Sequence, residues 1–121
     1  MSAMYRDTKL LELARGRNCL VGLRGICTAD DDTVVAAHSN QLRHGKGRGL
    51  KAEDCYTVWA CSACHIFIDA SQASRAERVA AWEAGWHRQK QEWKRIAEGT
   101  HSNPRSVNTC KAVLKYLEGK Q

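Results

Sequence analysis

Two cysteines, a histidine and an aspartate lie close together in the segment CSACHIFID, residues 61–69. A pair of cysteines separated by two residues, at the entry to a helix, is a common half of a structural zinc site. His65 and Asp69 are four residues apart, so they share one face of a helix, where an imidazole and a carboxylate suit a divalent ion with open positions. The segment is either a zinc half-site with incidental neighbours or two metal sites built back to back.

A second pair of cysteines predicts the other half of the zinc site. The two are separated by seven residues in CLVGLRGIC, and a glycine-containing turn can close that gap. The alternatives are that only the second pair binds metal or that neither does. Cys55 competes as a ligand, although a core position is favoured for it, and Cys110 is expected to be a packed free thiol. The predicted zinc ligands are Cys19, Cys27, Cys61 and Cys64.

Apolar periodicity and capping residues predict the elements that must position these side chains. The tryptophans of the long helix lie at roughly helical spacing, which predicts a core stripe; base stacking by an exposed tryptophan is the alternative. His87 and His101 are expected at the surface. In chain order we expect a helix over 7–15, a short strand and turn over 19–27, a strand over 33–38 ending in His38, a strand over 55–61, a helix from Ser62, a helix over 74–98 and a last helix capped by Asn103 with Pro104 at its first position.

The loop between the two central strands is rich in basic residues and contains no acidic residue from position 39 to 52. Its three glycines let a backbone approach a phosphate chain closely. We interpret this loop as a binding site for the DNA backbone; the alternative is a solvated mobile loop. His44 is also an alternative to His38 as the candidate general base. The predicted DNA contacts are Arg43, His44, Lys46, Arg48 and Lys51.

The size and charge of the chain favour one basic globular domain. It has 121 residues and a formal net charge of +6, and neutralising phosphates with basic side chains favours nucleic-acid binding. No apolar run is long enough to predict a membrane span, and the first residues do not predict a secretion signal. We therefore expect a cytoplasmic protein with reduced cysteines, which more often hold metal than form disulfides.

Strand, loop, strand and metal-binding helix is the plan of the ββα-metal, or HNH, nuclease fold. The stretches CLVGLRGIC, VVAAHSN, GKGRGLKAED and WACSACHIFID, roughly residues 15–69, resemble the YbcO-like family of small phage and prophage nucleases of HNH type. The resemblance implies an α+β fold: a treble-clef-like zinc core over 15–72 and a helical extension over 73–121. It also implies that His38 is the general base, that His65 and Asp69 hold a catalytic ion such as Mg²⁺ or Mn²⁺, and that the four cysteines hold zinc.

Three positions depart from the usual HNH pattern. Ala37 stands where many of these enzymes carry a further ligand just before the base. Asp54 stands near the place of the middle asparagine and could pin the loop. Asp69 stands where many relatives have histidine, which shifts the metal preference towards Mg²⁺ or Mn²⁺.

The leading hypothesis is a metal-dependent DNA endonuclease acting in phage or prophage DNA metabolism in a bacterial cytoplasm. The alternative is a zinc-stabilised DNA-binding module without catalysis, which Ala37 and the sparse ligand set favour. A third hypothesis is an interaction adaptor that self-associates through an exposed tryptophan-bearing helix, which requires most of Trp82, Trp86 and Trp93 to be exposed. None of the three requires a membrane.

Overall fold

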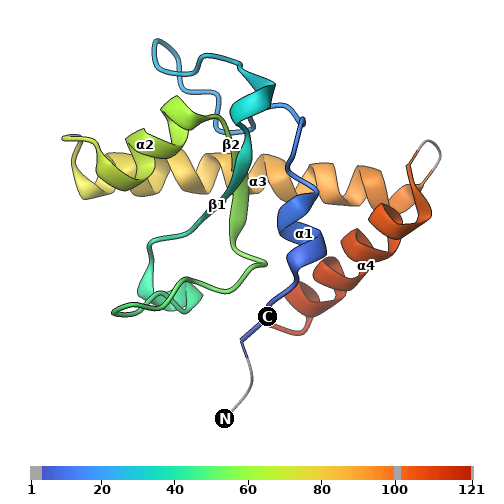
Figure 1. Cartoon of the computed structure of the whole chain (residues 1–121). Helices are drawn as coiled ribbons and strands as arrows, with labels where there is room; N and C mark the ends of the chain where they lie inside the picture. The colour runs from blue at the N-terminus through green and yellow to red at the C-terminus, as the bar shows by residue number, and fades with distance from the viewer. Residues whose placement is uncertain (1–3, 100–101, 121) are drawn as a thin grey trace.

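The computed structural model describes residues 4–99 and 102–120 and shows a mixed α+β architecture, as expected (Figure 1). A two-stranded sheet lies among helices that come both before and after it in the chain. In chain order the elements are α1 (Thr8–Glu12), β1 (Val35–His38), β2 (Thr57–Ala60), α2 (Ser62–Ala70), α3 (Arg75–Glu98) and α4 (Pro104–Glu118).

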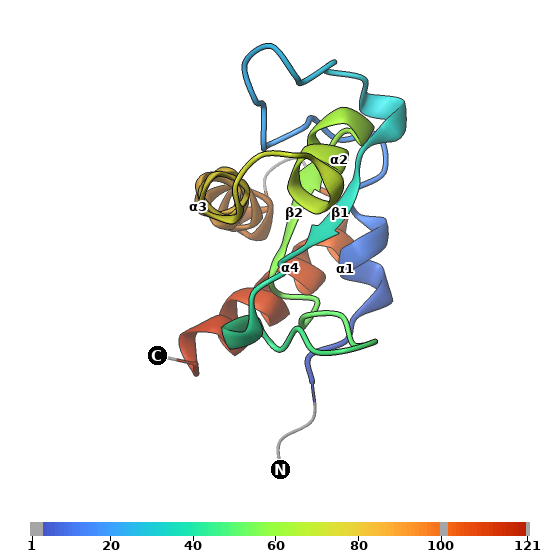
Figure 2. The same ribbon diagram turned by 90° about the vertical axis from the view of Figure 1, so that its left-hand side faces the viewer.

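The two predicted strands pair with each other in antiparallel register. Val35 lies opposite Ala60, and His38 lies opposite Thr57, so the histidine is held at the end of a paired strand. Every residue of β2 is buried, because α3 covers one side of the sheet and α1 lies on the other (Figure 2). This burial explains why β2 does not alternate between apolar and exposed polar residues; its one polar side chain, Thr57, donates its hydroxyl hydrogen to the Asp54 carbonyl at 2.9 Å.

The tryptophan stripe of α3 is a core stripe, as predicted. Trp82 is 2% exposed and Trp93 is fully buried. Trp86 is half-buried, and its indole N–H donates to the Cys55 carbonyl at 3.1 Å. The helix begins at a capping box formed by Ser74 and Glu77. Two of the three tryptophans are buried and the third is half-buried, so the adaptor hypothesis, which requires most of them to be exposed, is not supported.

Helix α4 begins as the sequence predicts. The Asn103 side chain accepts a hydrogen bond from the Arg105 backbone N–H, and Pro104 occupies the first turn. Cys110 is fully buried on its inner face, as expected of a packed thiol. One core cluster contains residues from both the 15–72 and the 73–121 segments.

Three expectations from the sequence need correction. Residues 19–27 form turns rather than a strand, with Gly22 and Gly25 at positive φ, and the Leu20 N–H donates to the Trp59 carbonyl at 2.8 Å. Helix α1 ends at Glu12 instead of continuing to residue 15, and a 3₁₀ turn occupies residues 31–33 before β1. His87 is exposed as predicted, whereas His101 lies outside the described residues. None of the helices described is long and apolar enough to cross a membrane.

Candidate metal centre and active site

The four predicted zinc ligands come together at the N-terminal end of α2. The ligand atoms of Cys19, Cys27, Cys61 and Cys64 all lie within 4.8 Å of one another. The sulfurs of Cys27 and Cys61 are 3.8 Å apart. Tetrahedral zinc with Zn–S bonds of about 2.3 Å places its sulfurs about 3.8 Å apart, so the donor set and its spacing fit structural zinc.

Backbone N–H groups donate to these sulfurs, which favours their charged form, but at Cys27 and Cys64 burial outweighs these bonds and raises the pKa. The Gly22 N–H donates to the Cys19 sulfur and the Ala29 N–H to the Cys27 sulfur, each at 3.4 Å. Burial alone would raise the pKa of Cys61, but hydrogen bonds from Cys64 and Thr28 outweigh it and lower the pKa to about 6. A thiolate is the form that binds metal.

His65 and Asp69 lie one turn along α2 and contact each other. The His65 Nε2 is 2.9 Å from an Asp69 carboxylate oxygen, and the Asn40 side chain donates to the other oxygen at 2.8 Å. The hydrogen bond to Asp69 raises the pKa of His65, and the same bond lowers the pKa of Asp69. An imidazole and a carboxylate therefore present adjacent donor atoms, held in place by Asn40.

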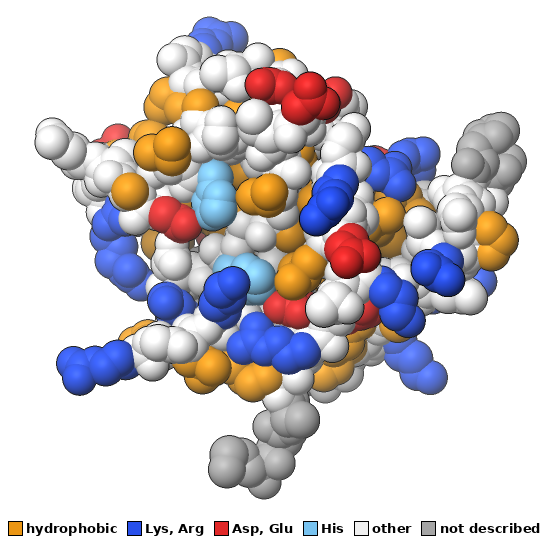
Figure 3. Space-filling view, in the orientation of Figure 1, with side chains coloured by type: hydrophobic (Ala, Val, Ile, Leu, Met, Phe, Trp, Pro, Cys, Tyr) orange, Lys and Arg blue, Asp and Glu red, His pale blue; other side chains and the backbone are white. Residues whose placement is uncertain are grey.

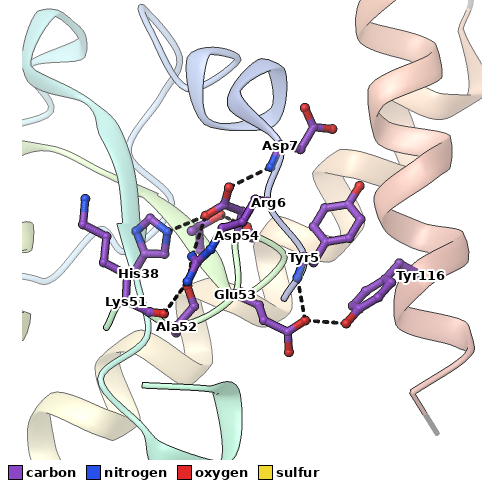
Figure 4. A network of polar contacts seen from close by, with 10 residues as sticks. Tyr5, Arg6, Asp7, His38, Lys51, Ala52, Glu53, Asp54 and Tyr116 are labelled. Atoms are coloured by element: carbon purple, nitrogen blue, oxygen red, sulfur yellow. Dashed lines mark hydrogen bonds and ion pairs between the residues drawn. The ribbon is translucent and has the colours of Figure 1, made fainter. Parts of the chain in front are cut away.

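His38, at the end of β1, is oriented by a buried carboxylate. Its Nε2 lies 2.9 Å from Asp54 Oδ1, while Asp54 Oδ2 accepts the Asp7 backbone N–H at 2.8 Å (Figure 4). Arg6 joins this network: its guanidinium lies 3.2 Å from Asp54 Oδ1 and donates to the carbonyls of Lys51 and Ala52. With Asp54 ionised, Nε2 carries the hydrogen, which leaves the lone pair on the Nδ1 of His38.

One cleft of about 520 Å³ brings the two histidines together. It is lined by the end of β1, one face of α2, residues of the basic loop and residues of α1. Figure 3 shows two histidine side chains on this face, with Lys and Arg side chains on both sides of them. The polar residues lining the cleft are Glu12, Arg15, His38, Ser39, Asn40, Lys46, Lys51, His65 and Asp69.

The basic loop divides into residues that face the cleft and residues that do not. Lys46 and Lys51 line the cleft, and Arg48 is exposed beyond it. Arg43 is exposed and forms an ion pair with Glu83.

The structure places His44 inside the protein. It is only 4% exposed, stacks on Tyr56 with ring centroids 4.1 Å apart, and hydrogen-bonds the Ser39 hydroxyl at 2.7 Å. Burial lowers the pKa of His44. A buried, stacked ring is not placed to contact DNA or to serve as an alternative base, so we leave His44 out of the proposed interface.

Several residues of the site were missed by the sequence reasoning. Asn40, two positions after His38, could have been noticed as a polar side chain next to a candidate base. Arg6 and Arg15 gave no such signal, because they reach the site only through tertiary contacts. Ala37 stands where a further metal ligand is usual in the HNH pattern. It is fully buried, and its carbonyl accepts a hydrogen bond from the Trp82 indole N–H.

Comparison with known proteins identifies the family. Residues 8–100 match the family described as "Putative nuclease YbcO", which covers more than half of the chain. The chain belongs to the YbcO family. The matched range includes the four clustered cysteines, His38, His65 and Asp69.

Individual relatives of this YbcO-family chain come from a bacterium and a phage. The proteins named "Putative nuclease YbcO" of Escherichia coli K12 and "Putative nuclease ybcO" of Enterobacteria phage 82 are each 43% identical over 60 residues. That match covers 50% of this chain and 62% of each relative's length. A solved structure titled as a putative bacteriophage protein from Escherichia coli K-12 has 29% identity and a TM-score of 0.55. The superposition covers 69% of this chain and 94% of that one.

Proposed function

We propose that this protein is a metal-dependent DNA endonuclease of the HNH type, built as a single domain. The observation that carries the proposal is the shared cleft, into which β1 presents His38 and α2 presents His65 and Asp69 beside Lys46 and Lys51. The order β1, loop, β2, α2 matches the ββα-metal plan, and the relatives are named as nucleases. The phage relative supports a role in phage or prophage DNA metabolism, in the cytoplasm of a bacterial host.

His38 is the proposed general base. Asp54 holds the ring so that Nδ1 can take a proton from a water molecule as the water oxygen attacks phosphorus. The bond from phosphorus to the leaving sugar oxygen breaks, and that oxygen leaves with the electron pair. A base held by a buried carboxylate keeps one tautomer and one orientation, which the proton transfer needs.

His65 and Asp69 are the proposed ligands of a divalent ion such as Mg²⁺ or Mn²⁺. Two neighbouring ligands of an octahedral ion with bonds of about 2.1 Å lie about 3.0 Å apart. The two donor atoms are 2.9 Å apart, close to that value, and an ion bound to both would replace the hydrogen bond that they now share. When bound, such an ion supplies positive charge to the scissile phosphate and the leaving oxygen. Asn40 keeps the Asp69 carboxylate turned towards this position.

The cysteine cluster has a supporting role in this proposal. Zinc on the four sulfurs would fix the start of α2, and the same helix presents His65 and Asp69 one turn later. Lys46, Lys51, Arg48 and Arg43 would contact DNA phosphates, which position the substrate but carry no sequence information. Cleavage with little base preference is therefore expected.

Plasmid cleavage tests the proposal. The zinc-loaded protein is incubated with supercoiled plasmid and added Mg²⁺, Mn²⁺ or Ni²⁺, beside His38→Ala and the exposed-histidine control His87→Ala. We expect ion-dependent nicking by the wild type and the control, and a loss of at least about 10²-fold in His38→Ala. DNA binding without any cleavage would instead favour the zinc-stabilised binding module. Equal cleavage by His38→Ala and wild type would remove His38 as the base.

A further inference from the structure

A second basic surface lies next to the catalytic cleft, between α1 and α4. A hollow of about 280 Å³ there is lined by four cationic side chains, with Ser106 and Thr109 beside them. A neighbouring hollow of about 310 Å³ shares two of these cations and adds Asn108. We call this surface the α1–α4 platform; its cations are Lys9, Arg15, Arg17 and Arg105.

The α1–α4 platform is continuous with the cleft that contains His38. Glu12 and Arg15 line both the cleft and the hollow between α1 and α4. Together with the basic loop, the platform places positive charge on two sides of the candidate site, as Figure 3 shows for this face of the molecule. A polymer crossing the cleft would therefore meet cations before and after the bond to be cut.

The α1–α4 platform has more cationic than acidic side chains. None of its four cations forms an ion pair with another residue of 4–99 or 102–120, in contrast to Arg43, which is paired with Glu83. Two acidic residues lie nearby: Glu12 lines the hollow, and the Asp7 carboxylate accepts backbone N–H groups at the start of α1. Arg17 lies over the Trp59 ring, 5.5 Å from its centroid.

The chemistry of the surface favours a duplex over a single strand. Proteins that hold single strands provide aromatic side chains on which successive bases stack. No Phe, Tyr or Trp of the described chain lines the cleft or the two hollows beside it. Cations and small hydroxyl or amide side chains suit phosphates instead, and in a duplex the bases are already stacked on one another.

We infer that the α1–α4 platform binds the phosphate backbone of double-stranded DNA beside the scissile bond. The inference rests on the proposed function for what the cleft does, but it specifies the substrate as a duplex. It also assigns DNA contacts to Lys9, Arg15, Arg17 and Arg105, which lie outside the basic loop.

The salt dependence of binding tests this inference without any cleavage. Fluorescence anisotropy is measured with a labelled duplex and with one of its strands, over a series of KCl concentrations and with no divalent ion added. The variant Lys9→Gln/Arg105→Gln removes two platform charges. The matched control Arg24→Gln/Lys94→Gln removes the same two residue types at exposed positions that line neither the cleft nor the platform.

We expect the wild type to bind the duplex more tightly than the strand. The platform variant should reduce the slope of log K against log [salt] by about 1.8, because each lost phosphate contact contributes about 0.9, whereas the control should keep the wild-type slope. All proteins should show the same zinc content and thermal midpoint. Equal slopes for the two variants, or a strand bound as tightly as the duplex, would overturn the inference. Duplex binding with the expected slopes but no plasmid cleavage would support DNA binding by the α1–α4 platform and contradict the proposed nuclease activity.

Discussion

The cysteine cluster at the start of α2 and the cleft one turn later differ in how their charged side chains are balanced. At its start, the sulfurs of four cysteines lie within 4.8 Å of one another, and a cluster of thiolates repels itself unless a cation lies among them. One turn later, His65 is paired with Asp69, and across the cleft His38 at the end of β1 is paired with Asp54. A cation bound among the four sulfurs would remove that repulsion, whereas the histidines of the cleft are paired with carboxylates without one.

This difference separates folding from function. Removing a ligand from the cysteine cluster should damage the fold, because the cluster joins residues 19–27 to the start of α2. Removing a group from the cleft should change the chemistry and leave the fold largely intact. Three substitutions test whether the cysteine cluster determines folding and the cleft determines activity. The substitution with the greatest expected effect comes first.

The largest effect is expected for Cys61→Ala. It removes one of four ligands, and binding of structural zinc contributes on the order of 10 kcal/mol to folding in small zinc domains. We expect loss of bound zinc and of cooperative thermal unfolding, measured by metal analysis and circular dichroism. Cys110→Ala, which removes an equally buried thiol outside the cluster, should keep its zinc. Full zinc content in Cys61→Ala would show that the cluster is not the zinc site.

An intermediate effect is expected for Asp54→Asn. The amide would favour the tautomer of His38 with hydrogen on Nδ1, so the ring could no longer accept a proton there; such changes cost about 10²–10⁴-fold in rate. We expect kcat for cleavage to fall with KM for DNA little changed, and the pH profile of kcat to alter. The thermal midpoint should fall only slightly.

Asp7→Asn is the matched control for this change. The Asp7 carboxylate caps α1 and does not touch His38, so its variant should cleave at the wild-type rate. If both variants lost activity equally, the effect of Asp54 would be structural rather than a matter of orienting His38.

The smallest effect is expected for Asp69→Asn in the absence of divalent ions. The raised pKa of His65 adds stability that is lost as pH rises through it, and the lowered pKa of Asp69 adds stability that is lost as pH falls through it. The pair therefore contributes most between about pH 4 and pH 6.5. Since both groups are partly exposed, we expect less than about 1 kcal/mol.

Urea unfolding at about pH 5 and about pH 9 would measure this loss, which should vanish at the higher pH. Asp32→Asn, an exposed acid with no ion pair among the described residues, should show no such difference. With an ion present, a proton on His65 competes for the same nitrogen. Divalent-ion affinity should therefore rise with pH, and its midpoint should move lower in Asp69→Asn.

The sequence predicted those parts of the fold that local patterns determine. The extent of α3, the Asn103 cap of α4, the two strands and the tryptophan stripe of α3 could all be predicted from neighbouring residues. The proximity of the four cysteines could also be predicted, because cysteines at such spacings, if they stay reduced, more often hold a metal than serve other roles.

What the sequence did not predict comes from distant contacts. Residues 19–27 alternate like a strand, but two glycines at positive φ and the four-cysteine cluster hold them in turns. His44 looked exposed in a basic loop, yet it stacks on Tyr56. Arg6 reaches Asp54 across 48 positions, and no local pattern marks such a pair.

The contact between Tyr116 and Glu53 bears on when the protein could become active during its synthesis. The Tyr116 hydroxyl of α4 donates to Glu53, the neighbour of Asp54 (Figure 4). Lys120 lies 3.2 Å from the same carboxylate. The ribosome makes His38 and His65 before it makes α4, so a nascent chain would carry the proposed cutting groups without this support. A chain truncated after Glu98 should therefore cleave poorly even with zinc bound, which would delay any cutting until α4 has been made.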